Sequence, residues 1–210
     1  MINDENIKQA ISKALEEKGS RKFVQSVEMA VNFKNIDMSK QENKLNLEVT
    51  LPKGRGKNIN LVVFADGNVA ADAKAAGAEF VIGSDQISKY KKSDIKRLAK
   101  NSEFFAQPQL MVLVGKNFGQ ILGGRGKIPK PLVGNVSLML KNARNVVKIR
   151  SRGKFLPVVH CAIGTENMSV DDLTENAKAV LNAIRNKVGG DSVIKSVVIK
   201  LSMGKPVKVE

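Results

Sequence analysis

The side chains best suited to nucleophilic or metal chemistry in this chain are one histidine and one cysteine. His160 and Cys161 are adjacent, within an alternating stretch typical of a β-strand. Successive side chains of a strand point to opposite faces, so these two cannot act together as a Cys–His pair. A metal ion at either residue would lack further soft ligands. We therefore predict no catalytic residue and no metal site.

Two aspartates offer a different chemistry. Asp66 follows the apolar stretch 61–65, and Asp85 follows a second one at 80–82. Carboxylates that follow neighbouring strands could hold a magnesium ion for phosphoryl transfer. Asp-Gly, as at 66–67, is also a common turn pair. A magnesium-dependent phosphate-handling enzyme that uses Asp66 and Asp85 is therefore the alternative to a binding function.

Cations interleaved with glycine point to binding of a phosphate backbone instead. Such stretches occur at 53–57, at 123–131 and, after a Ser-Met-Gly sequence, at 202–206. Glycine lets the main chain approach phosphates and sugars closely, and the cations neutralise them. None of the loops matches the nucleotide phosphate loop, because Ile128 and not Ser or Thr follows Lys127. The candidate contacts are Lys53, Arg55 and Lys57 in the first loop, Arg125, Lys127 and Lys130 in the second, and Lys205 in the third.

The second loop lies in a long stretch without acids. Residues 104–165 contain no Asp or Glu in 62 positions, yet they contain ten Lys and Arg. Such a stretch projects an unbalanced positive field that attracts a polyanion. A solvated basic surface kept for solubility is the alternative. The length of the stretch and its Gly and Pro content favour nucleic-acid binding.

Composition agrees with a folded, basic protein. The net charge is +15, from 35 Lys and Arg against 20 Asp and Glu, and 42% of the residues are hydrophobic, too many for a disordered basic tail. Without Trp and with Tyr90 alone among tyrosines, the chain is poorly supplied with rings for base stacking. The single cysteine fits a reducing compartment, and no apolar stretch approaches the length of a membrane helix. We expect a soluble cytoplasmic protein that reads phosphates, sugars and shape.

The elements that must position these loops are of two kinds, which differ in the spacing of their apolar residues. Near both ends of the chain, helices are predicted with apolar residues at helical spacing, at 7–15 and 170–188. Alternating stretches at the same ends predict half-buried strands, at 27–33, 45–51, 156–163 and 196–201. In the middle, uniformly apolar runs at 61–64, 80–82 and 110–114 alternate with helical stretches at 69–77 and 84–101. This alternation is typical of a parallel sheet covered on both faces, to which 146–149 adds a further strand.

These two kinds of apolar pattern predict two domains. Residues 1–58 and 154–210 form one discontinuous domain, and residues 59–153 form an inserted parallel α/β domain. The insert carries 16 basic and 6 acidic residues, a net charge of +10, so it supplies most of the long-range field.

At its basic loops the chain resembles a known family, the large-subunit ribosomal protein one family of the exit-site stalk, and especially the archaeal members. The similarity runs over nearly the whole chain. It rests on Arg21-Lys22-Phe23 and on the stretches 51–57, 122–131 and 201–204. Long matched loops at matched spacing make this resemblance specific.

The resemblance implies a two-domain α/β protein: a discontinuous terminal α+β domain with a split β-α-β arrangement, interrupted by an inserted Rossmann-like parallel α/β domain. It implies no enzymatic activity, no cofactor, a monomer when free and a place in the large ribosomal subunit. The implied partners are 23S-type rRNA of the exit-site stalk, deacylated tRNA at the exit site, and the protein's own mRNA, whose translation it would repress. A nonspecific nucleic-acid-binding protein is the further alternative.

The resemblance also implies which residues bind RNA. Specific contacts carry over to Lys22, Phe23, Ser202, Met203 and Gly204, and the insert adds phosphate and tRNA contacts. Three positions depart from the family pattern. Ser202 replaces Thr and keeps the hydroxyl. Lys205 stands where Pro is usual, which predicts a looser and more cationic turn, and Gly124 likewise replaces Pro.

Overall fold

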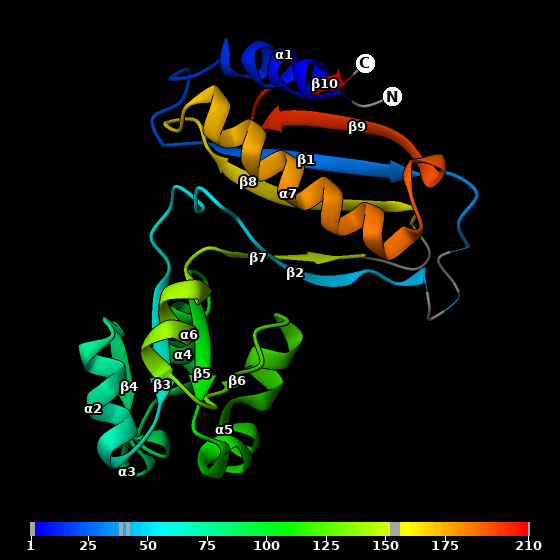
Figure 1. The fold of residues 1–210 in the computed structure, drawn as a ribbon. Coiled ribbons are helices and arrows are strands. Elements are labelled where there is room, and N and C mark those ends of the chain that lie inside the picture. Colours follow the sequence, from blue (N-terminus) through cyan, green and yellow to red (C-terminus); the bar gives the residue numbers. More distant parts are fainter. Residues whose placement is uncertain (1–2, 38–39, 41–42, 152–155, 210) are drawn as a thin grey trace. The chain divides into compact units, whose positions relative to one another are not determined.

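The computed structural model describes residues 3–37, 40, 43–151 and 156–209 (Figure 1). It divides into two compact units. Residues 1–57 and 145–210 form one, which we call the terminal unit, and residues 58–144 form the inserted unit. The chain is α/β, as predicted, with an antiparallel sheet in the terminal unit and a parallel sheet in the inserted unit. In the described part of the chain, no helix is long and apolar enough to cross a membrane.

The terminal unit is built on a four-stranded antiparallel sheet in the order β10-β9-β1-β8. Its strands are β1 (Ser26–Phe33), β8 (Val158–Thr165), β9 (Ile194–Leu201) and β10 (Val207–Val209). Burial alternates along β1, so one face of the sheet meets the core. Because β8 and β9 both run antiparallel to β1 and lie on either side of it, the crossover through helix α7 is a split β-α-β unit.

Two helices, α1 (Asp4–Leu15) and α7 (Val170–Val188), share one core with this sheet. Ser169 caps α7, because its hydroxyl accepts from the backbone N–H of Asp172 at 3.1 Å. Gly189 ends the helix in the left-handed conformation, with φ 84°. Asn3 occupies the N-cap position of α1 without a side-chain cap bond, and α1 ends at Leu15.

A two-stranded ribbon completes the terminal unit. Strand β2 (Asn46–Thr50) pairs antiparallel with β7 (Val146–Arg150). The sequence predicts a strand at 146–149 but places it in the parallel sheet, and that placement is wrong. The partner of β7 is β2, an alternating strand in which only Val49 is buried, and not a uniformly apolar strand.

The inserted unit has a parallel sheet in the order β4-β3-β5-β6. The strands are β3 (Asn60–Phe64), β4 (Phe80–Ile82), β5 (Ser102–Ala106) and β6 (Lys130–Pro131). Its α-helices are α2 (Gly67–Ala75), α3 (Ser84–Ile87), α4 (Lys92–Leu98), α5 (Met111–Gly124) and α6 (Val136–Ala143), and Pro108–Leu110 form a 3₁₀ turn, η2. Alternate residues of β3 and β5 pack into two cores, one with α3, α4 and α5 and the other with α2 and α6. Both faces of the sheet are therefore covered, as parallel sheets require.

The apolar run at 110–114 is not the strand that its composition suggests. Most of it forms the start of α5, which follows the 3₁₀ turn that contains Pro108. This helix buries Val114, Phe118 and Leu122 at helical spacing. The third strand is 102–106 instead, where Ser102 and Glu103 interrupt the apolar pattern. The predicted helix 84–101 is divided into α3 and α4.

Charge is shared more evenly than the sequence predicts. With β7 in the terminal unit, the inserted unit carries 13 basic and 6 acidic residues, a net charge of +7, and the terminal unit carries 22 and 14, a net charge of +8. The terminal unit thus has a positive field of its own.

Candidate nucleic-acid interface

Two predicted contact segments, about 180 residues apart in sequence, meet where β1 begins and β9 ends. The backbone N–H of Ser202 donates to the carbonyl of Ser26 at 3.0 Å. The next N–H, of Met203, donates to the side-chain oxygen of Gln25 at 3.1 Å. The ladder of β1 and β9 thereby extends past Leu201, so the Lys22-Phe23 segment and the Ser-Met-Gly turn are held side by side.

The outer side of this junction carries large apolar groups. Phe23 is 51% exposed and Met203 is 64% exposed, and Lys22, which precedes Phe23 in the sequence, is exposed as well. Water is an unfavourable neighbour for such side chains. A cation next to two exposed apolar groups suits a partner with both charge and flat apolar surface, as nucleotides have.

Lys57 joins the same junction from the first basic loop. Its ammonium group donates to the hydroxyl of Ser26 at 2.8 Å. The hydroxyl of Ser202 lies 3.0 Å from a carboxylate oxygen of Glu28 and 3.4 Å from the carbonyl of Ser26. A hydroxyl has one proton to give, so the Ser202 oxygen keeps acceptor capacity for a partner.

The turn after β9 is tight. Gly204 donates its N–H to the carbonyl of Leu201 at 3.0 Å, and a Cβ at position 204 would lie 3.0 Å from the Cβ of Leu201. Lys205 donates its backbone N–H to a carboxylate oxygen of Glu17 at 3.1 Å. Proline has no such N–H. Lys205 therefore fastens the turn to the residues after α1 by a bond that the usual Pro cannot make, which differs from the looser turn that the sequence predicts.

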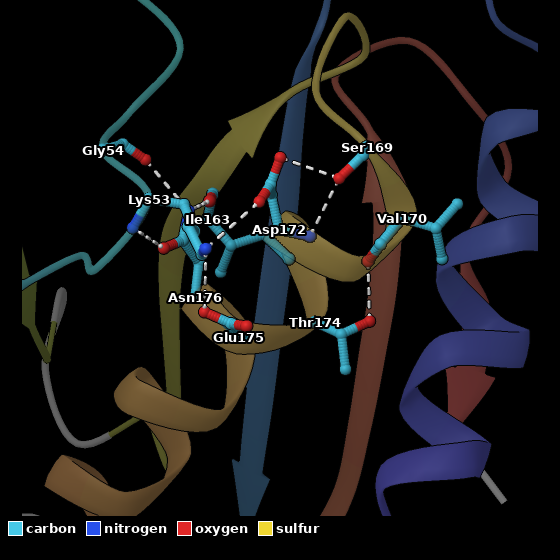
Figure 2. A network of polar contacts seen from close by, with 9 residues as sticks. All are labelled: Lys53, Gly54, Ile163, Ser169, Val170, Asp172, Thr174, Glu175 and Asn176. Carbon is cyan, nitrogen blue, oxygen red and sulfur yellow. Dashed lines mark hydrogen bonds and ion pairs between the residues drawn. The ribbon is translucent and has the colours of Figure 1, made fainter.

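The loop 53–57 is anchored by one buried side chain. Asn176 of α7 is fully buried and accepts from the N–H of Lys53 at 3.0 Å (Figure 2). Its NH₂ group donates to the carbonyls of Gly54 at 2.9 Å and Ile163 at 2.8 Å. Gly56 has φ 66°, and a Cβ there would lie 2.8 Å from the sulfur of Met168. The loop thus packs closely against the end of β8 and the start of α7.

The ammonium group of Lys53 faces acids of α7. It forms ion pairs with Asp172 and Glu175 (Figure 2), at 3.7 Å and 3.5 Å from their carboxylate oxygens. These side chains are 39–52% exposed, so water and salt screen the attraction. The ion pairs therefore hold the Lys53 ammonium group only weakly, and Arg55 is half-buried in the same loop.

Sequence reasoning missed the buried polar residues beneath this surface. Gln25 is 1% exposed and Glu166 is 4% exposed, and they exchange main-chain and side-chain hydrogen bonds. Asn176 gave a signal that could have been used, because it is a polar residue three positions after Leu173 on the apolar stripe of α7. Glu166 comes directly after an alternating strand, and no sequence pattern there indicates that its side chain is buried.

The three cations predicted in the insert lie in the inserted unit. The guanidinium of Arg125 donates to the carbonyl of Lys96 at 3.1 Å, and the ammonium of Lys127 donates to the carbonyl of Ser102 at 2.8 Å. Lys130 is in the edge strand β6, opposite Phe105. The side chains of Arg125 and Lys127 are thus partly committed to hydrogen bonds within their own unit.

The histidine and cysteine considered for catalysis do not form a pair. His160 is exposed and Cys161 is buried on opposite faces of β8, as predicted. Burial, with a smaller effect of Glu28, raises the pKa of Cys161 to about 12, so its thiol stays neutral. Asp66 accepts from the N–H of Ser84 at 2.9 Å. Within the described ranges, no three His, Cys, Asp or Glu side chains gather as metal ligands would.

Comparison with known proteins agrees with the family resemblance seen in the sequence. Residues 10–205 match the family model of the ribosomal protein L1p/L10e family. The large ribosomal subunit protein uL1 of Thermococcus kodakarensis is 43% identical over 209 residues, which cover 96% of this chain and 95% of that protein. Its namesake from Methanothermobacter thermautotrophicus is 41% identical over 211 residues, covering 98% and 99%.

These relatives are named as ribosomal proteins and not as enzymes. The match extends over most of both units and includes every predicted contact residue. The chain therefore belongs to the ribosomal protein L1p/L10e family.

Proposed function

We propose that this protein is a structural protein of the large ribosomal subunit that binds rRNA through the end of its antiparallel sheet. The observation that carries the proposal is the convergence of three segments around Ser26. Lys57 and the Ser202–Lys205 turn bind Ser26 and Gln25, which follow the Lys22-Phe23 segment along the chain, through hydrogen bonds of 2.8–3.1 Å. The names of its relatives support the same assignment.

Each group at the junction has a role that its chemistry allows. Lys22, Lys57 and Lys205 neutralise phosphates. The oxygen of Ser202 accepts from a ribose 2′-hydroxyl, a group that distinguishes RNA from DNA. Phe23 and Met203 cover the apolar faces of sugars and bases, and the bare backbone at Gly204 admits close approach of the RNA. Recognition of this kind reads an irregular RNA by its shape and sugar–phosphate backbone rather than by stacked aromatic platforms.

The family resemblance supplies the finer assignment. The rRNA would be the 23S-type stalk beside the exit site, and the protein would assist release of deacylated tRNA there. It would also repress translation of its own mRNA by binding a similar RNA structure. Free protein would be monomeric and cytoplasmic. Arg125, Lys127 and Lys130 would add phosphate or tRNA contacts.

The test is to crosslink the protein to RNA in cells and sequence what is recovered. We expect one stalk region of large-subunit rRNA and one site in the protein's own mRNA to dominate. In vitro, the recovered rRNA fragment should bind more tightly than a scrambled hairpin of equal length at physiological salt. Crosslinks spread evenly over cellular RNA, with no preference in vitro, would favour nonspecific binding. A phosphate-releasing turnover that Asp66→Asn abolishes would favour the enzyme.

A further inference from the structure

A buried carboxylate lies directly beneath the proposed interface. Glu166 follows β8 and is 4% exposed. One of its oxygens accepts from the N–H of Gln25 at 3.0 Å. The other oxygen accepts from the side-chain NH₂ of Gln25 at 3.4 Å and from the N–H of Gly19 at 3.5 Å. Gly19 and Gln25 bracket the segment that contains Lys22 and Phe23, so one side chain holds both of its ends.

The same carboxylate decides which way the Gln25 amide points. Gln25 is 1% exposed, and its amide has one accepting end and one donating end. A carboxylate only accepts, so it draws the NH₂ end toward itself and leaves the oxygen facing the N–H of Met203 at 3.1 Å. The reversed amide would set oxygen against carboxylate and NH₂ against N–H, which are two repulsive contacts. Glu166 thereby also fixes the first residue of the exposed turn.

We propose that Glu166 is a positioning residue for RNA recognition. Without touching RNA, it sets Phe23 and Met203 in register with each other. A buried charge is costly to desolvate, and a neutral side chain would cost less. A glutamine at position 166 would have only one accepting oxygen. Its NH₂ group would face either the backbone N–H of Gln25 or the pair of donors formed by the Gln25 side chain and the Gly19 N–H, and a donor cannot accept from them. The carboxylate is the side chain of this size that satisfies all three donors.

This inference rests on the proposed function, because the effect is measured on RNA binding. If the two segments are free to move, binding must order them, and that cost lowers specific affinity. No phosphate contact is lost, so nonspecific affinity and the salt dependence stay the same. The expected signature is thus a selective loss of affinity for the recovered rRNA fragment, of about tenfold or ~1.4 kcal/mol.

The experiment compares Glu166→Gln with Val180→Ala in the full-length protein. Val180 is fully buried in α7 of the same unit and belongs to the same core, so its truncation lowers stability without touching the junction. Thermal unfolding calibrates the two variants, and binding is titrated against the rRNA fragment and the scrambled hairpin at several salt concentrations. We expect E166Q alone to lose specific affinity. Equal losses in both variants, or equal losses on both RNAs, would overturn the proposal.

Hydrogen exchange supplies a readout that needs no RNA. In E166Q the amides of Gly19, Gln25 and Met203 should exchange at least tenfold faster relative to the core, whereas V180A should leave that ratio unchanged. Unchanged exchange at these amides in E166Q would refute the positioning role whatever the RNA data show. If exchange responds but the wild-type protein shows no preference between the RNAs, the proposed function fails and the positioning role stands.

A double-mutant cycle tests the route through Gln25. Gln25→Met keeps the length of the side chain but cannot accept from Met203 or donate to Glu166. If Glu166 acts through the Gln25 amide, the double variant should lose little more specific affinity than the worse single variant. Additive losses would show that the route to Met203 is wrong.

Discussion

At the scale of single residues, the exposed contacts and the buried groups that hold them have different origins in the sequence. The glycine–lysine loops and the Ser-Met-Gly turn are visible as patterns, because phosphate-binding chemistry restricts residue types. Gln25, Glu166 and Asn176 are not visible in this way, since what matters is which donor meets which acceptor after folding. Their partners lie 122–178 residues away along the chain in most of their hydrogen bonds.

Gly204→Val tests the turn. Gly204 does not adopt a left-handed conformation, so the backbone conformation does not require a glycine there. The remaining reason is space, because the new Cβ meets Leu201 at 3.0 Å and Glu17 at 2.9 Å. Specific binding should fall by about 1–3 kcal/mol with the salt slope unchanged. Gly119→Ala, at a position open within 4 Å, is the control and should bind normally.

Lys57→Met tests a phosphate contact. The ammonium group lies at the junction and bonds only a hydroxyl there. All RNAs should bind more weakly by a similar factor, and the slope of log K against log salt should fall by about one. Lys127→Met is the comparison: its ammonium already binds the carbonyl of Ser102, so we expect a smaller slope change and lower stability of the inserted unit. Sequence-selective loss in the Lys57 variant would contradict this role.

Cys161 should report unfolding. Burial raises the pKa of its thiol to about 12 from an ordinary 9.0, so the reactive thiolate is scarce in the folded protein at pH 8. Iodoacetamide labelling should therefore follow the rate of opening and become fast in denaturant. Because the folded pKa is the higher one, its contribution to stability is complete below pH 9 and declines as the pH rises toward 12. Cys161→Val should lack that decline, and rapid native labelling would show that the thiol is accessible.

At the scale of elements, regular patterns predicted structure well where one periodicity dominates. The helix predicted at 170–188 is confirmed, because its apolar stripe lies between a capping serine, Ser169, and a terminating glycine, Gly189. The run at 110–114 failed because a short apolar stretch has no period of its own, and only the continuing spacing to Leu122 shows a helix. The strand at 146–149 was found, but its partner was decided by tertiary pairing.

Asn176→Ala tests how α7 holds the loop 53–57. The change removes one acceptor and two donor bonds in a fully buried place. We expect a loss of about 3 kcal/mol in the free energy of unfolding, since buried groups are left unsatisfied. Thr174→Val is the matched control two residues away, because it removes only a bond to the carbonyl of Val170 within the same helix. Chemical denaturation of both variants measures the difference, and equal stabilities would show that Asn176 is not the anchor.

At the scale of the whole molecule, the feature to test is that the chain leaves the terminal unit and re-enters it at neighbouring residues. Leu51 donates its N–H to the carbonyl of Asn145 at 2.9 Å, and Thr50 pairs with Val146. The inserted unit therefore leaves and re-enters the terminal unit at neighbouring positions. A protein in which a short flexible linker joins residue 57 to residue 145 should fold cooperatively around the core that the described helices and strands share.

This shortened protein should also keep most of the preference for the recovered rRNA fragment, because the junction around Ser26 lies within it. Its salt slope should be lower, since 13 basic residues are removed with the insert. Circular dichroism and binding titrations measure both properties. An unfolded product, or a folded one that binds both RNAs alike, would show that the two terminal segments are not a self-sufficient RNA-binding domain.

The pairing of β1 with β9 has a consequence for the order in which the protein becomes active during its synthesis. Strand β1 and the Lys22-Phe23 segment leave the translating ribosome early, but the turn that completes their surface follows Leu201. Under the proposed function, a nascent chain displays basic loops without the partner that would make them selective until that turn emerges. Discrimination between RNAs would then be acquired only when β9 pairs with β1.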